Sequence, residues 1–216
     1  MKKMMIGLLL VAGMAQSCFI RINDKLLQAS VNSSEDLPEV DWVKADTLPA
    51  GVRHIDVMGS YDVVFKQADD ARFELSGTGN LQSCLCTVEG DRLVIRSANQ
   101  RRMVQPFSGD ITVTVSMPGL ESISLAGSGD FNAASLDVEN LDVSLAGSGD
   151  ISLSRLQVEN LSVSLAGSGD VKLKGNASWA SLSLAGSGDI DARELDCPEI
   201  ETRQSGSGDI SLPKGD

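Results

Sequence analysis

The sequence predicts an all-β protein built as a right-handed parallel β-helix, or β-solenoid, with rungs of about 20 residues. The tetrapeptide Gly-Ser-Gly-Asp occurs five times in the last 90 residues, and its aspartates are 20, 20, 19 and 20 residues apart. Apolar residues alternate with small polar residues around each copy. The composition agrees, because 21 glycines and only 4% aromatic residues in 216 indicate a turn-rich chain with an aliphatic core.

Each repeat predicts one rung made of two or three short strands. Aligned on the aspartate, the positions before the tetrapeptide form an apolar set, and another apolar residue follows each aspartate. Such alternation with a period of two indicates strands with one buried face. Equivalent residues then stack at about 4.8 Å, so that five rungs span about 24 Å. One internal column is predicted to hold Leu125, Leu145, Leu165 and Leu184.

Residues 1–17 are typical of an export signal. Lys2 and Lys3 precede an apolar stretch over residues 6–14, which is too short to span a bilayer. A small residue, Ser17, stands directly before Cys18, as in the cleavage site of bacterial lipoproteins, although Ala15 replaces the usual leucine. We therefore expect Cys18 to be the lipidated N-terminus of the mature protein, held at the outer membrane. An ordinary secretory signal is the alternative.

The remaining chain is expected to form a tether followed by one domain. Residues 18–45 are polar and weakly periodic, as in a flexible tether. Residues 46–216 are expected to form a single solenoid, with the marked rungs over residues 120–216. Residues 50–118 have an irregular β-rich pattern that is expected to cap the first rung and continue its sheets. Within it, residues 75–80 look like a degenerate copy of the repeated turn.

Charge and cysteine content exclude some functions. A net charge of −12 argues against binding nucleic acid or anionic lipid headgroups, which need a basic surface. Cys84, Cys86 and Cys197 cannot form a complete set of disulfides and have no further metal ligands at suitable spacing, so we expect packing roles.

The chain resembles a bacterial family of putative auto-transporter adhesins that carry a head GIN domain. The resemblance covers about residues 50–216 and is carried by His54-Ile55-Asp56-Val57, by the strand before Pro118-Gly119-Leu120, and by the serial Ser-Leu-Ala-Gly-Ser-Gly-Asp repeats. It implies a fold like that of the pectin-lyase-type right-handed β-helices and a role in cell adhesion. It implies no catalytic residues.

The aligned repeats predict a column of carboxylates and hydroxyls on one corner of the solenoid. Its members are Asp130, Asp150, Asp170, Asp189 and Asp209, with Ser128, Ser148, Ser168, Ser187 and Ser207. Glycine suits such a corner because it adopts positive φ without steric cost, and the polar side chains can bond nearby amides. The column is also a candidate site for a ligand or for Ca²⁺, since neighbouring carboxylates repel unless something offsets their charge.

These observations favour a non-enzymatic binding module of the cell envelope without a cofactor. We expect a glycan or protein ligand at the cell surface and membrane attachment through the lipid on Cys18; the sequence indicates no oligomeric state. One alternative is a polysaccharide-acting enzyme, in which carboxylates outside the repeat pattern line a groove. Another is a structural module stabilised by Ca²⁺.

Overall fold

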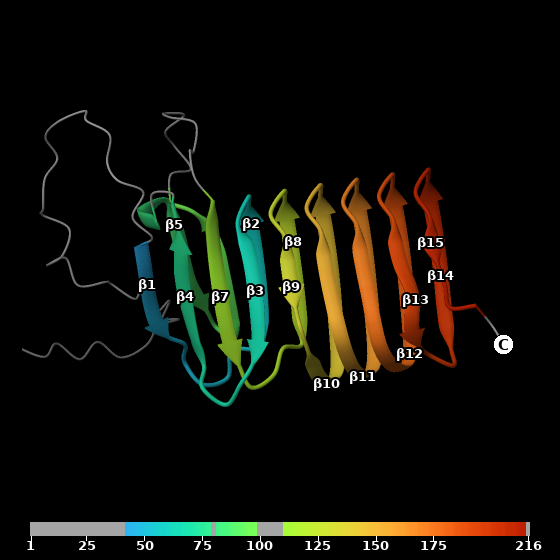
Figure 1. Ribbon diagram of the computed structural model, residues 1–216, viewed down its shortest axis with the longest axis horizontal. Coiled ribbons are helices and arrows are strands. Elements are labelled where there is room, and N and C mark those ends of the chain that lie inside the picture. Colours follow the sequence, from blue (N-terminus) through green and yellow to red (C-terminus); the bar gives the residue numbers. More distant parts are fainter. Residues whose placement is uncertain (1–41, 79–80, 99–109, 215–216) are drawn as a thin grey trace, which may run out of the picture.

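A β-solenoid is confirmed by the computed structural model, which describes residues 42–78, 81–98 and 110–214 (Figure 1). Its N-terminal part contains β1 (Trp42–Thr47), β2 (His54–Gly59), β3 (Asp62–Gln67), β4 (Arg72–Gly77), a 3₁₀ turn over Leu81–Ser83, β5 (Cys84–Glu89), β6 (Arg92–Ser97) and β7 (Ile111–Met117). The repeats contain β8 (Ser122–Gly127), β9 (Phe131–Ala133), β10 (Leu136–Gly147), β11 (Ile151–Gly167), β12 (Val171–Gly186), β13 (Ile190–Asp196), β14 (Ile200–Gly206) and β15 (Ile210–Ser211).

The repeated rungs stack in parallel and in register. β10 pairs with β11 at an offset of 20 residues, from Leu136 opposite Leu156 to Gly147 opposite Gly167. In the 19-residue repeat, the register shifts after Leu153, and Leu156 then lies opposite Gly175. A Cβ on Gly175 would lie 2.3 Å from the carbonyl oxygen of Leu156, and its φ is +132°. Glycine is therefore required where the chain shortens the rung by one residue.

The core consists of columns of aliphatic side chains inside the solenoid. The predicted column of Leu125, Leu145, Leu165 and Leu184 is present, with each side chain about 1% exposed. The residues that follow the aspartates form a second column, which continues to Val63 through Phe131. Each buried Leu or Ile contributes roughly 1.5–3 kcal/mol relative to an exposed one, so stacking creates a core that a single rung lacks.

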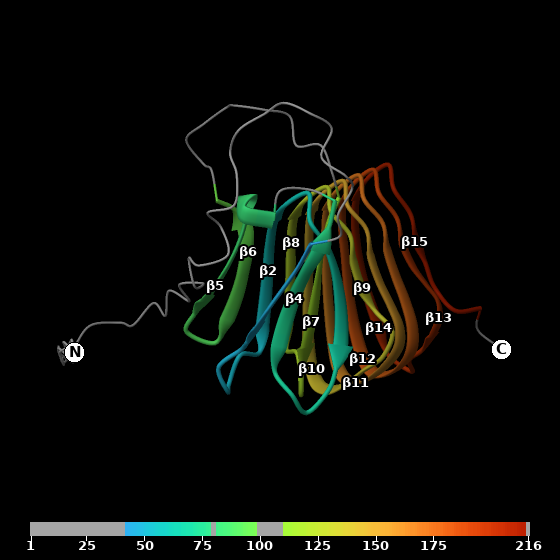
Figure 2. The ribbon, with the colours of Figure 1, turned by 60° about the vertical axis from the view of Figure 1, so that its left-hand side comes forward.

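The N-terminal strands extend the sheets in an order that differs from their order in the chain. β2 lies between β6 and β8 and is parallel to both. β3 likewise lies between β7 and β9. The chain therefore makes β2 and β3, then builds a rung-like layer from β6 and β7 on one side, and returns to start β8 on the other. Antiparallel β5 and β4–β1 cover the outer edges of this layer (Figure 2).

The return from β7 to β8 crosses the end of β3 and is fastened by one side chain. The Gln67 amide donates to the Pro118 carbonyl at 2.8 Å and to the Asp137 carbonyl at 2.9 Å. Its oxygen accepts from the Asp137 backbone amide at 2.8 Å. The side chain of Gln67 thus makes the bonds that a neighbouring backbone would otherwise make at this point.

The prediction that residues 75–80 are a degenerate copy of the repeated turn is wrong. β4 ends at Gly77 and runs antiparallel to both β1 and β7, so the described part of this segment, residues 75–78, forms no corner between parallel rungs. The expected cap that continues the sheets is present. The predicted signal over residues 1–17, Cys18 and most of the predicted tether lie outside the described residues, while β1 begins at Trp42. In the described part of the chain, no helix is long and apolar enough to cross a membrane.

Candidate functional site at the corner column and the adjoining sheet

The two glycines of each Gly-Ser-Gly-Asp corner let adjacent rungs touch. A Cβ on Gly147 would lie 2.0 Å from the carbonyl oxygen of Gly127, and the φ of Gly147 is +150°. A Cβ on Gly149 would lie 1.9 Å from the carbonyl oxygen of Gly129. The Gly127 carbonyl instead accepts bonds from the amides of Ser148 at 2.9 Å and Gly149 at 3.3 Å. Backbone contact between rungs thus fills the space where side chains would stand.

The aspartates of the corners form a continuous ladder. Oδ1 of Asp130 accepts a hydrogen bond from the Asp150 amide at 3.0 Å, and Oδ1 of Asp150 accepts from the Asp170 amide at 2.8 Å. The same bond joins the next two steps, ending at the amide of Asp209. One oxygen of each carboxylate, except that of Asp209, therefore satisfies the next backbone amide.

The ladder has a sixth member that sequence reasoning missed. Oδ1 of Asp62 accepts from the Asp130 amide at 3.0 Å, and Gly59-Ser60-Tyr61-Asp62 forms the corner between β2 and β3. Tyr61 stands where the repeats have their second glycine. In the later corners, the Cβ of this residue would strike the corner of the preceding rung. No Gly-Ser-Gly-Asp corner precedes Tyr61, so the larger side chain is tolerated and its hydroxyl donates to the Ser83 carbonyl.

The serines of the corners point to solvent. All five predicted serines are exposed, and the five predicted aspartates are exposed or half-buried. No basic side chain of the described segments forms an ion pair with the six aspartates of the ladder. The described residues contain no group of three or more His, Cys, Asp or Glu side chains that could hold a metal ion. The structure therefore gives the aspartates a backbone-binding role, and ligand or Ca²⁺ binding by the column stays a prediction.

Beside the column lies a flat surface that we call the serine–alanine face. It is formed by the outward positions of β8 and of the matching parts of β10, β11 and β12, together with the corner serines. Sixteen positions on these four rungs carry small side chains with a single charge, that of Asp142. They are Ser122, Ser124, Ala126, Ser128, Asp142, Ser144, Ala146, Ser148, Ser162, Ser164, Ala166, Ser168, Ser181, Ser183, Ala185 and Ser187.

The alanine row of this face continues onto larger apolar side chains. Met58 lies opposite Ala126, Arg96 lies opposite Met58, and Leu85 lies opposite Arg96. Met58 is 48% exposed and Leu85 is 36% exposed, which is unusual for large apolar side chains in this otherwise well-buried set. The row therefore runs from small side chains over the repeats to bulkier ones over the N-terminal layer.

The other broad surface of the repeats carries charged side chains on its C-terminal rungs. On β12 and β13, Lys174 Nζ lies 2.7 Å from Glu194 Oε1, and Asp191 pairs with Arg193. The hydrogen bond from Arg193 lowers the pKa of Asp191 to about 2. Charged pairs on this surface and hydroxyls on the other make the two sides chemically distinct.

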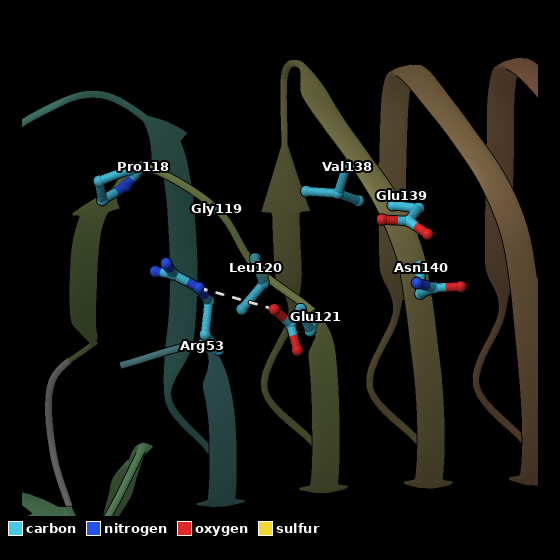
Figure 3. A pocket seen from close by; sticks show the side chains of 8 residues that line it. All are labelled: Arg53, Pro118, Gly119, Leu120, Glu121, Val138, Glu139 and Asn140. Atoms are coloured by element: carbon cyan, nitrogen blue, oxygen red, sulfur yellow. Dashed lines mark ion pairs between the residues drawn. The ribbon is translucent and has the colours of Figure 1, made fainter. Parts of the chain in front are cut away.

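A shallow hollow of about 280 Å³ lies where the chain crosses from β7 to β8 (Figure 3). It is lined by Arg53, by residues 118–121 and by Val138, Glu139 and Asn140 of the neighbouring rung. Arg53 Nε lies 3.6 Å from Glu121 Oε1, and both side chains are about half exposed. Glu121 and Glu139 are carboxylates outside the Gly-Ser-Gly-Asp pattern, which is the arrangement expected of the enzymatic alternative, but the Glu121 charge is already compensated by Arg53.

The predicted packing roles of the cysteines agree with their surroundings. Cys84 is buried and Cys197 is partly buried against the core, and both are free thiols. Burial raises the pKa of the Cys197 thiol, and its Sγ lies 3.2 Å from the Glu199 carbonyl. A raised pKa disfavours the thiolate, which is the reactive and metal-binding form.

Comparison with known proteins places this architecture in a family. A family model described as putative auto-transporter adhesin, head GIN domain, matches residues 53–214, and the chain belongs to this family. A crystal structure of a putative adhesin from Bacteroides fragilis is similar, with 26% identity, a TM-score of 0.74 and coverage of 81% of this chain and 80% of that one. No curated protein matches the chain.

Two further crystal structures, both from Parabacteroides distasonis, share the fold. A putative lipid binding protein is 22% identical, with a TM-score of 0.62 and coverage of 79% of this chain and 81% of that one. A putative adhesin is 21% identical, with a TM-score of 0.58 and coverage of 80% and 82%. The neighbours thus bear names of adhesion and of lipid binding on the same solenoid, and family membership indicates a cell-surface or envelope protein.

Proposed function

We propose that the protein is a non-catalytic binding module of the bacterial cell envelope, which adheres through its serine–alanine face. The observation that carries this proposal is the row-by-row repetition of exposed or half-buried serine and alanine side chains on the outward face of one sheet. Buried hydroxyl groups would need partners within the fold, whereas these hydroxyls face outward and are available to a ligand. Their repetition suits an extended ligand with a repeating structure.

The chemistry of the face favours a neutral glycan. Serine hydroxyls donate and accept hydrogen bonds, as sugar hydroxyls do, and the flat alanine row offers apolar contact to sugar rings. The net charge of −12 disfavours an acidic polysaccharide, and the face itself holds one charge among sixteen positions. An extended protein segment is the other ligand class that the test must distinguish.

The proposal is tested by blocking the face with large charged side chains. We expect Ser144→Arg/Ser164→Arg to abolish retention of the protein on immobilised neutral polysaccharides and to reduce adherence of cells that display it. Ser154→Arg is the matched control, because Ser154 is exposed on the opposite surface of the same rung. The proposal fails if the double variant and the control behave alike, or if only protein ligands retain the wild-type chain.

Membrane attachment through Cys18 is part of the same proposal. Its support is the signal-like segment over residues 1–17 followed by a cysteine. We expect Cys18→Ser to move the protein from the membrane fraction to the soluble fraction while leaving the fold intact. Protease treatment of whole cells then reports which side of the outer membrane carries the solenoid. Retention of the variant in the membrane fraction would contradict a lipid anchor.

An enzymatic function has one observation in its favour, the hollow with Glu121 and Glu139. Turnover of a polysaccharide that is lost in Glu121→Gln and Glu139→Gln, but kept in Ser144→Arg/Ser164→Arg, would replace the binding proposal. The openness of the hollow and the Arg53–Glu121 ion pair favour binding over catalysis, because catalytic carboxylates require a tuned, protected environment.

A further inference from the structure

The last rung of the solenoid, which contains β14 and β15, presents an open edge. Every strand inside the repeats has a neighbour on both sides, whereas β14 pairs only with β12 and β15 pairs only with β13. The backbone groups on the far side of Ile200–Gly206 therefore lack a strand partner in the described part of the chain. Leu212, beyond β15, is 40% exposed at the same end. Such an edge pairs readily with another strand unless its side chains prevent it.

The side chains of β14 depart from the repeat in a systematic way. Its inward positions carry Thr202 and Gln204 opposite Leu182 and Leu184 of β12, so polar groups close the core. The Gln204 side chain donates to the Gly208 carbonyl across this end. Its outward positions carry Glu201 and Arg203, opposite Ser181 and Ser183.

The two charges of β14 have opposite signs and lie two residues apart. Both side chains are exposed, and neither takes part in an ion pair among the described residues. A parallel in-register partner strand of the same sequence would place glutamate beside glutamate and arginine beside arginine. An antiparallel copy centred on Thr202 would instead place Glu201 of each copy opposite Arg203 of the other. Opposite charges directly across an antiparallel pair are favourable and like charges are not.

From this self-complementary edge we infer that two copies of the chain associate end to end, with β14 pairing antiparallel to β14 of the second copy about a twofold axis at Thr202. Threonine then faces threonine, Ile200 faces Gln204, and Glu201 faces Arg203 twice. A twofold contact of this kind is closed, because it uses the same patch of both copies and leaves no further edge for a third. The contact joins one seven-residue strand of each copy, so we expect a weak dimer that requires high protein concentration.

The charge pattern gives a decisive test, carried out on the full chain with Cys18→Ser so that no lipid joins two copies. Sedimentation velocity over a range of concentrations should show a concentration-dependent dimer. Glu201→Arg and Arg203→Glu should each weaken it at least tenfold, because each places like charges opposite one another twice. The double variant Glu201→Arg/Arg203→Glu should restore the dimer. An equimolar mixture of the two single variants should also dimerise, since their charges match.

Glu159→Arg is the matched control, because it makes the same charge change at an exposed position of β11, which β12 separates from β14 and its open edge. The inference is overturned if the wild-type chain is monomeric at every concentration, if the control weakens the dimer as much as Glu201→Arg, or if the double variant is no better than the single variants. Thermal unfolding of each variant separates loss of pairing from loss of fold.

A cross-link locates the axis. In antiparallel strands, directly opposed Cα atoms lie about 4.5–5.5 Å apart, within the range that a disulfide spans. Thr202→Cys should therefore form a disulfide-linked dimer under mild oxidation, whereas Ser207→Cys, exposed at the neighbouring corner, should not. Equal cross-linking of both variants, or of neither, would contradict the twofold pairing at Thr202.

Discussion

Single residues at the corners decide whether rungs can stack. The second glycine of each corner is needed for space, since its Cβ would lie about 2 Å from a carbonyl oxygen of the preceding rung. The first glycine is needed for both space and its positive φ. Tyr61 occupies the second-glycine position only where no such corner precedes it, so the glycine requirement arises from the neighbouring rung and not from the turn itself.

Gly149→Ala tests this requirement. The added methyl group would overlap the Gly129 carbonyl oxygen at 1.9 Å, and backbone cannot rotate away as a side chain does. We expect a loss of about 3 kcal/mol in the free energy of unfolding, measured by urea denaturation. Ser148→Ala, one position earlier and exposed, should change it by less than about 0.5 kcal/mol. Similar losses for both variants would contradict the stacking argument.

The aspartate ladder makes a second prediction. Asp150→Ala leaves the Asp170 amide without its acceptor and should cost about 1 kcal/mol, whereas Asp150→Asn keeps an acceptor oxygen and removes one repelling charge. Asp209 provides the control, because it is the last member of the ladder and its carboxylate accepts no bond from a following rung. If Asp209→Ala destabilises the protein as much as Asp150→Ala, the hydrogen bond from each carboxylate to the next amide does not account for the stabilisation.

Ionisation of the Tyr61 phenol should lower the free energy of unfolding at alkaline pH. Burial raises the pKa of its phenol above the ordinary value of 10.0, with smaller effects from Cys84 and Cys86 and an opposing hydrogen bond with Ser97. The unfolded chain therefore loses this proton at a lower pH than the folded chain. The contribution to stability is complete below pH 10 and is lost as the pH rises through the folded pKa. Tyr61 is the only tyrosine, so ultraviolet absorbance titrates it alone. Ionisation at or below pH 10 in the native protein would refute the prediction.

Whole rungs are nearly interchangeable units of the solenoid. β10 and β11 pair in register at a constant offset of 20 residues from Leu136 to Gly147, and each contacts mainly its neighbours. Their stability is therefore close to a sum of rung and interface terms. The 19-residue rung shows how narrow the tolerance is, because the loss of one residue required Gly175 at the site of the register shift.

Removal of residues 141–160 should give a shorter protein that still folds. Leu161 would follow Asn140 as Leu141 does now, and the amide of Asp170 would meet the carboxylate of Asp130. We expect cooperative unfolding at a lower temperature, with the denaturant dependence of stability reduced by roughly one eighth, because 20 of the 160 described residues are removed from the surface exposed on unfolding. Removal of residues 141–150 alone should abolish folding, since it breaks the register. A folded half-rung deletion, seen by circular dichroism, would contradict this view.

Sequence patterns predicted the elements well where the relevant contacts repeat. The column of Leu125, Leu145, Leu165 and Leu184 could be read directly, because identical spacing forces identical residues together. The position of β2 between β6 and β8 could not be predicted, because no local feature of the sequence indicates which earlier strand a later strand will pair with. The corner at Gly59–Asp62 was missed because Tyr61 masks the repeat. Among the site residues, the column of serines and the bonding of the aspartates to nearby amides were predicted, whereas the particular amide that each aspartate binds, that of the next rung's aspartate, depends on atomic register.

The molecule as a whole carries a row of six carboxylates on one edge and a net charge of −12. Repulsion along this edge should be relieved by screening. We expect the melting temperature to rise with ionic strength, and to rise equally with CaCl₂ and MgCl₂ at matched ionic strength, because the described residues hold no cluster of three metal ligands. A larger rise with CaCl₂, reversed by a chelator, would instead support the Ca²⁺-stabilised module.

The placement of β2 between two strands gives the solenoid unequal mechanical strength at its ends. A pulling force on the C-terminus meets β15 and β14, which are each held along one edge, and detaches rungs one after another as a zipper opens. A force on the N-terminal side meets β1 first, which is also held along one edge, by β4, but unfolding of the layer behind it requires β2, held along both edges, to shear two ladders at once. We therefore expect a force on the C-terminal side to lengthen the molecule gradually, rung by rung, and the layer around β2 to unfold last.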